Sequence, residues 1–86
     1  MSKREKRLLK IRQSQKDVSM QELRQLLEDF GFKYEPTDGS HYIFRYNNGG
    51  LNFKIPIPFH RPIKEYYVKQ VIKLIDQIIA QEKHDE

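Results

Sequence analysis

The sequence predicts an α+β domain, in which two helices pack on one face of a three-stranded antiparallel sheet and an extra helix precedes them. Apolar residues recur at helical spacing over residues 20–30 and again over residues 65–81. Between these stretches, residues 32–55 alternate apolar and polar side chains and are interrupted by turn residues. Two layers, with both helices on the apolar sheet face, bury this apolar surface most simply and leave the other sheet face open to water.

Composition limits the chain to one small domain. It has 86 residues, of which 37% are hydrophobic and 33% are charged, so the core is lean. The absence of cysteine excludes a disulfide framework and thiolate metal sites, and it fits a reducing compartment. There is no apolar run of membrane-spanning length and no apolar secretory segment at the N-terminus. We therefore expect a cytoplasmic protein with no membrane partner.

The net charge of +4 is concentrated at one end. Residues 1–17 carry seven basic and two acidic side chains, whereas the rest of the chain carries nine basic and ten acidic ones. Such an arm can bind phosphates without sequence preference, but a solvated charged extension explains it equally well. We divide the chain into a basic arm or short helix (1–17), a domain (18–81) and a polar tail (82–86). Within the arm, residues 4–13 predict a weak helix without a clear cap.

Two helices are predicted to flank the sheet. Ser19 and Glu22 have the spacing of a capping box, and Gly31 is typical of a helix end, so the first helix should run from about Met20 to Phe30. The second should run from Lys64 or Glu65 to roughly Gln81. Its apolar stripe is wide enough to cover the N-terminal helix or, alternatively, a second protein. The tyrosines and phenylalanines of the chain are expected mostly in the core.

Turn residues divide the sheet region into three strands. The first covers Phe32–Glu35, the second runs from His41 to Tyr46, and the third covers Leu51–Ile55. A turn at Asn48 and Gly49 predicts a pairing of Phe44 with Phe53, Arg45 with Asn52, and His41 near Pro56. Prolines 56, 58 and 62 should end the sheet and form a loop with residues 59–61.

The open sheet face should carry Lys33, His41, Ile43, Arg45, Asn52 and Lys54. Cations in a row suit a phosphate backbone, and histidine can transfer protons near neutral pH. RNA supplies its own nucleophile, the 2′-hydroxyl, so cleavage needs a base, an acid and positive charge but no metal. A lone exposed histidine on a strand is, however, usually only a surface residue. Metal-ligand spacings are absent from the sequence, and we expect no metal and no cofactor.

The order of short motifs adds a family resemblance. A helix ending in Gly31 and Phe32 is followed by Gly39, Ser40 and His41, then by Phe44 and Arg45, an Ile-Pro strand end, Arg61–Lys64 and Tyr67–Gln70. Over about residues 17–80 this order resembles the HicA family of toxins. The Gly-Ser-His step, with Gly-Phe upstream, is its most specific part. The chain differs from many family members in carrying Glu35 and Asp38 just before this step, where they have basic residues, and Glu65 and Tyr66 where they have Gly-Thr.

The resemblance implies an endoribonuclease toxin of a type II toxin–antitoxin pair, a stress-response enzyme with a fold similar to the double-stranded-RNA-binding domain. It implies cleavage of messenger RNA, His41 as the catalytic residue, and inhibition by a cognate HicB antitoxin. Gly39 and Ser40 would form the tight turn that presents His41. The residues expected to contact RNA are Lys33, Ser40, Arg45, Lys54, Arg61 and Lys64.

Two other functions fit the same residues. One is a non-catalytic RNA-binding module that uses the open sheet face and the basic arm. The other is a small interaction protein whose open face is an antitoxin or dimer interface. RNA cleavage that depends on His41 distinguishes the endoribonuclease toxin from both of these alternatives. Salt-dependent RNA affinity distinguishes the RNA-binding module from the interaction protein.

Overall fold

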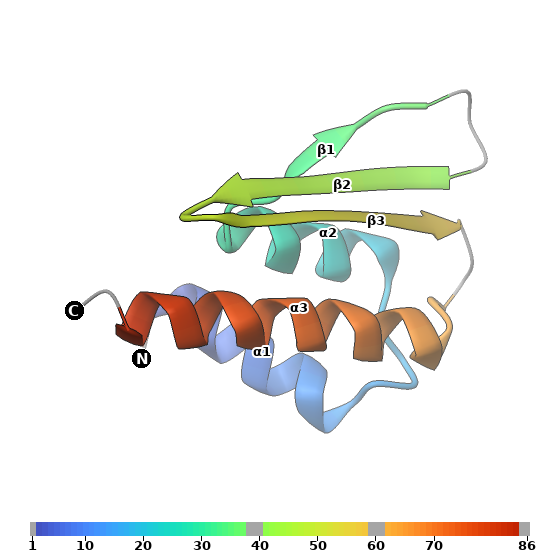
Figure 1. Cartoon of the computed structure of the whole chain (residues 1–86). Helices are drawn as coiled ribbons and strands as arrows, with labels where there is room; N and C mark the ends of the chain where they lie inside the picture. Colours follow the sequence, from blue (N-terminus) through green and yellow to red (C-terminus); the bar gives the residue numbers. More distant parts are fainter. Residues whose placement is uncertain (1, 38–40, 59–61, 85–86) are drawn as a thin grey trace.

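A computed structural model describes residues 2–37, 41–58 and 62–84, the side chain of residue 84 excepted. In these residues the chain forms the elements α1 (Lys3–Gln13), α2 (Met20–Asp29), β1 (Lys33–Glu35), β2 (His41–Asn48), β3 (Leu51–Pro58) and α3 (Glu65–His84). The strands form one antiparallel sheet in the order β1-β2-β3, and the helices lie on one side of it (Figure 1). The predicted α+β class and the arrangement of a double-stranded-RNA-binding domain are confirmed.

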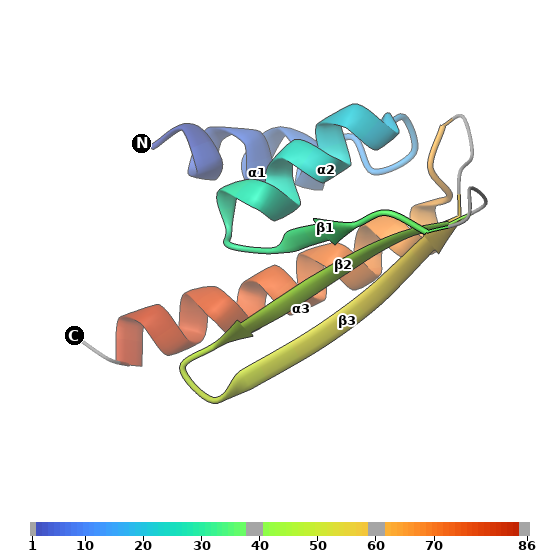
Figure 2. The same cartoon turned by 90° about the horizontal axis from the view of Figure 1, so that it is seen from above.

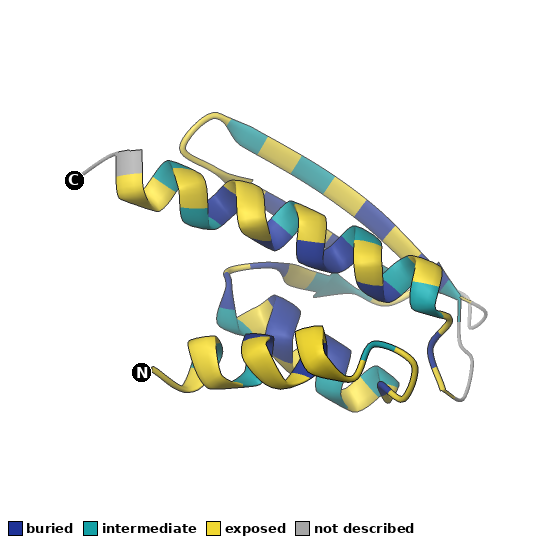
Figure 3. Ribbon diagram, turned by 90° about the horizontal axis from the view of Figure 1, so that it is seen from below, coloured by how far each residue is buried: buried dark blue, intermediate teal, exposed yellow. Residues whose placement is uncertain are grey.

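The core lies between the sheet and the helices. Phe44 and Ile57 are fully buried on the inner sheet face, whereas Arg45, one position after Phe44 on β2, and Lys54, three positions before Ile57 on β3, are exposed. Along α3, buried positions recur between exposed ones about once per turn, as Figure 3 shows. The core residues contributed by α2 and α3 are Leu23, Leu26, Leu27, Val68, Val71, Ile72, Ile75 and Ile78. The outer sheet face is therefore free of helices, as the alternation predicts.

Both ends of α2 follow from the local sequence. The Ser19 hydroxyl accepts a hydrogen bond from the backbone N–H of Glu22 at 3.1 Å, which confirms the predicted cap. At the other end Gly31 adopts a φ of +97°, and its N–H donates to the Glu28 carbonyl at 3.0 Å. The N–H of the next residue, Phe32, donates to the Leu27 carbonyl at 3.0 Å. These two bonds form a Schellman motif, which turns the chain directly into β1.

The hairpin between β2 and β3 corrects the predicted register by two residues. Its turn is formed by Gly49 and Gly50, with φ of +58° and +86°, and not by Asn48 and Gly49. A tight hairpin turn of this kind needs positive φ at both central residues, which two glycines adopt without steric cost. Phe44 consequently pairs with Ile55 and not with Phe53. A shift of two residues keeps every side chain on its face, so the predicted faces remain correct.

The sheet continues past Pro56, contrary to our prediction, and β3 ends at Pro58. Pro56 and Pro58 lie within β3, paired with Ile43 and His41, and His41 is therefore opposite Pro58 and not near Pro56. β3 is an edge strand, so the side of a proline that lacks an N–H can face away from β2 without loss of a sheet hydrogen bond. His41 thus has a strand partner on β3.

Helix α1 packs against α2 on the side away from the sheet and lies beside α3 (Figures 1 and 2). Leu8 and Ile11 are buried in the common core, whereas Leu9 is 44% exposed. Helix α1 is in contact with α3, as expected. The helix also has a cap that the sequence analysis missed, because the Ser2 hydroxyl accepts from the N–H of Glu5 at 3.3 Å. At the other end of the chain, α3 extends to residue 84, three residues beyond its predicted end.

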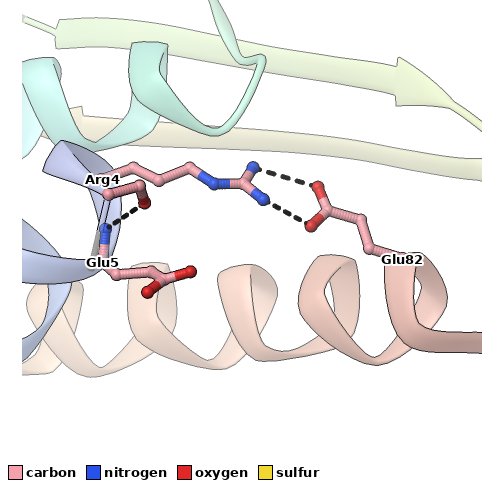
Figure 4. A network of polar contacts seen from close by, with 4 residues as sticks. Arg4, Glu5 and Glu82 are labelled. Atoms are coloured by element: carbon pink, nitrogen blue, oxygen red, sulfur yellow. Dashed lines mark hydrogen bonds and ion pairs between the residues drawn. The ribbon is translucent and has the colours of Figure 1, made fainter.

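The arginines of α1 hold it against the rest of the domain. Arg4 makes a two-pronged contact with Glu82 of α3, with N–O distances of 3.0 and 2.6 Å (Figure 4). The hydrogen bond to Glu82 raises the pKa of Arg4 above its usual value, so this charge is retained at all physiological pH values. Arg7 pairs with Asp29 of α2, and Arg12 pairs with an aspartate of α3, Asp76. Much of the positive charge at the N-terminal end is therefore balanced within the molecule.

Candidate functional site

The strand register brings three cations together on the open face. Lys33 of β1 pairs with Arg45 of β2, which in turn pairs with Lys54 of β3, and all three are exposed. Paired residues on neighbouring antiparallel strands lie about 5 Å apart at Cα. The register predicted from the sequence would have put Asn52 next to Arg45. The observed register replaces it with Lys54 and so produces a continuous cation row, Lys33, Arg45 and Lys54, across the sheet.

One carboxylate shields the centre of this cation row. The Nε of Arg45 donates to Oε2 of Glu35 at 2.6 Å, and both side chains are about half exposed. Glu35 lies on β1 two residues after Lys33, so it shares the open face. The sequence departs from the family pattern at Glu35, and in the structure this residue neutralises Arg45.

His41 lies on the same open face, at the beginning of β2. It is exposed, and its backbone is held on one side by the pairing with Pro58. On the other side, the Thr37 hydroxyl donates to the His41 carbonyl at 2.6 Å. Arg45 lies four positions after His41 on β2, or about 13 Å at Cα at ~3.3 Å per residue. The guanidinium and the imidazole therefore belong to separate parts of the open face.

A pocket of about 450 Å³ lies beside His41. Lys54 and Pro56 line it from the open face of β3, and Ile55 lines it from the inner face, so the pocket lies at the free edge of this strand. The remaining described lining residues come from α3 and are Tyr66, Tyr67, Gln70 and Leu74. Lys54 thus belongs both to the pocket and to the cation row, and it connects the two.

The sequence analysis missed the α3 side of this pocket, because it assigned the tyrosines mostly to the core. Tyr66 is 64% exposed and lies outside the buried stripe of α3. An aromatic residue placed off the apolar stripe of an otherwise amphipathic helix was the available signal. Tyr67 is half-buried, and its ring meets that of Tyr66 edge-on, with centroids 5.1 Å apart.

The other predicted site residues have different positions. Lys64 is exposed directly before α3, where its carbonyl accepts from the N–H of Tyr67 at 2.9 Å, and it is not among the described residues that line the pocket. Ser40 and Arg61 lie outside the described residues, as does Gly39. The structure therefore brings together His41, Lys54, Arg45 and Lys33 on one face and says nothing of the remaining two predicted contacts.

Among residues 2–37, 41–58 and 62–84, no group of three or more His, Cys, Asp or Glu side chains is arranged to hold a metal ion. Within the same part of the chain, every helix is too short or too polar to cross a bilayer.

A family model described as the HicA toxin of bacterial toxin–antitoxin systems matches residues 20–77, which is more than half of the chain. The match defines the class of protein as a toxin of such a pair, and α1 and the C-terminal end of α3 lie outside it. The chain belongs to the HicA toxin family. Membership supports a toxin role and implies an antitoxin partner. Neither a search of curated proteins nor one of solved structures found a significant match.

Proposed function

We propose that this toxin is a metal-independent endoribonuclease that cleaves messenger RNA in the cytoplasm, with His41 as its catalytic residue and a HicB-type protein as its antitoxin. The observation that supports it best is the position of His41, exposed in a pocket with Lys54 and on the same face as the cation row. The family match and the Gly-Ser-His step at residues 39–41 support the same reaction.

The proposed reaction uses the nucleophile that RNA carries. His41 removes the proton of a 2′-hydroxyl, and the O2′ attacks the adjacent phosphorus while the bond from phosphorus to O5′ breaks. The products are a 2′,3′-cyclic phosphate and a 5′-hydroxyl, and the leaving O5′ takes a proton from the imidazolium or from water. The Lys54 ammonium, which shares the pocket, offsets the negative charge that grows on the phosphate oxygens.

The cation row contacts the part of the RNA strand next to the cleaved bond. Because Arg45 and His41 are about 13 Å apart along β2, the row holds phosphates next to the scissile one. Lys33 and Lys54 flank Arg45, and Glu35 reduces its contribution. Lys64, Ser40 and Arg61 remain proposed RNA contacts on the basis of the sequence.

The test is the substitution His41→Ala, compared with Asn52→Ala at another exposed position of the same sheet face. We expect His41→Ala to reduce RNA cleavage by about 10²- to 10⁴-fold, the usual contribution of one acid–base group, and to abolish growth arrest. Asn52→Ala should keep both, and cleavage by the unmodified protein should persist in a metal chelator. Full cleavage by the His41→Ala protein would refute the proposal.

The cation row by itself also favours a second function, a non-catalytic RNA-binding module, because two of its three charges, those of Lys33 and Arg45, lie outside the pocket that His41 lines. In that case the unmodified protein would bind RNA with a steep salt dependence, would not cleave it, and would bind equally well after His41→Ala.

A further inference from the structure

Tyr66 is an aromatic side chain in a position that folding does not explain. Among the described residues, only Leu9 and Tyr66 are large hydrophobic side chains that remain exposed, and Tyr66 is the more exposed of the two. Its ring is held by the edge-on contact with Tyr67, which packs against the core. An exposed ring that is held in place has a free π-face for a partner.

The pocket next to this ring has the groups that a nucleobase needs. Along one flank of α3 the side chains of Tyr66, Gln70 and Leu74 follow one another at helical spacing, and Ile55 and Pro56 of β3 add apolar surface. Gln70 offers an amide that can both donate and accept hydrogen bonds at the edge of a base. Lys54 and His41 are the described basic groups in the lining, and no carboxylate is among the described lining residues. This charge suits a ligand that carries phosphate.

We propose that the pocket takes one unpaired base of the RNA strand, stacked on Tyr66 with its edge toward Gln70, so that the substrate is single-stranded RNA. The inference rests on the proposed function, and it specifies the substrate of the same site. A base inside a duplex has both π-faces and its pairing edge occupied, so it can enter a side pocket only after unstacking and unpairing. This toxin therefore selects unpaired RNA, although its fold resembles that of a domain that binds duplexes.

The experiment compares Tyr66→Ala with Tyr66→Phe, which keeps the ring, and with Gln77→Ala, an exposed α3 residue that is not among the described lining residues. Affinity for a labelled oligoribonucleotide is measured in a His41→Ala background, and cleavage is measured with His41 present. The same oligoribonucleotide annealed to its complement is the duplex probe. Because Tyr66 is largely exposed, the variants should keep the fold, and thermal unfolding checks this.

Tyr66→Ala should weaken binding of the single strand by about 5- to 150-fold, the range of one base–aromatic stack. Tyr66→Phe and Gln77→Ala should bind like the parent. The duplex should be bound weakly by all the proteins and cut more slowly than the single strand.

Two outcomes would overturn the inference: single-strand affinity unaffected by Tyr66→Ala, or duplex cut as fast as the single strand. Each of them, if cleavage still depends on His41, leaves the proposed function intact. Cleavage that is absent, or that survives His41→Ala, contradicts the proposed function itself.

Discussion

The ion pair between Glu35 and Arg45 yields the sharpest test of the cation row. In the substitution Glu35→Gln, an amide of nearly the same shape replaces the carboxylate, and Arg45 becomes available to phosphate. The pair is about half exposed, with 49% and 47% of the side chains accessible, so its loss should lower the free energy of unfolding by only about 0.2–1 kcal/mol. Because this loss of stability is small, the variant stays folded, and a change in its RNA affinity reports on the charge of the open face.

The size of the expected change in the salt dependence of RNA affinity follows from the charges on the open face. The cation row offers three charges, of which Glu35 offsets one, so the substitution raises the effective number from two to three. For single strands, the logarithm of the binding constant falls with the logarithm of salt by about 0.7 per neutralised phosphate. The contribution of the cation row to the slope should change from about −1.4 to about −2.1. Between 50 and 200 mM salt, this contribution alone should lower affinity by about 18-fold in place of about 7-fold.

A matched control is available on the helical side of the molecule. Glu82→Gln also removes one carboxylate from an Arg–Glu pair with an N–O distance of 2.6 Å and with similar exposure, but its partner is Arg4 of α1 (Figure 4). Both variants change the net charge equally. Fluorescence anisotropy of a labelled single-stranded RNA, titrated at several salt concentrations in the His41→Ala background, measures both slopes. Glu82→Gln should leave the slope near that of the parent.

Two results would refute the reasoning. If Glu35→Gln left the slope unchanged, the open face would not be in contact with RNA, or Arg45 would not be shielded. If Glu35→Gln and Glu82→Gln steepened the slope equally, overall charge rather than the cation row would determine affinity.

Two further predictions concern stability, and denaturant unfolding measures both. Ile11→Ala should cost about 2–5 kcal/mol because Ile11 is only 1% exposed, whereas Leu9→Ala, at an exposed position of the same helix, should cost less than about 0.5 kcal/mol. Equal small costs would show that α1 is not part of the folded core. Gly31→Ala should cost about 1–2 kcal/mol, because φ is +97° and the new Cβ would lie 3.2 Å from the Tyr46 ring; an unchanged midpoint would contradict the left-handed conformation.

The sequence predicted the local features of this protein well. The cap at Ser19, the helix end at Gly31 and the inward or outward direction of each strand residue depend on neighbours within a few positions, so a single sequence carries enough information for them. The same alternation put His41, Arg45 and Lys54 on one face. The Gly-Ser-His step led to the family that the match over residues 20–77 shows.

The register of the β2–β3 hairpin could not be predicted from the local sequence. Asn48 and Gly49 form a good turn by composition, but so do Gly49 and Gly50, and only the pairing of whole strands decides between them. The observed turn puts Tyr46 opposite Phe53, with stacked rings whose centroids lie 5.9 Å apart. Whether proline can continue a strand likewise depends on whether that strand is at an edge, which no local pattern states.

By itself, therefore, the sequence determined the helices, the two faces of the sheet and the residue types on the open face. Only the tertiary structure decided that Lys33, Arg45 and Lys54 are neighbours, that Glu35 neutralises one of them, and that Tyr66 of α3 joins His41 in one pocket. The physical reason is distance along the chain. Caps and alternation are interactions between residues a few positions apart, whereas the cation row and the pocket join segments whose relative placement is set by strand register and helix packing.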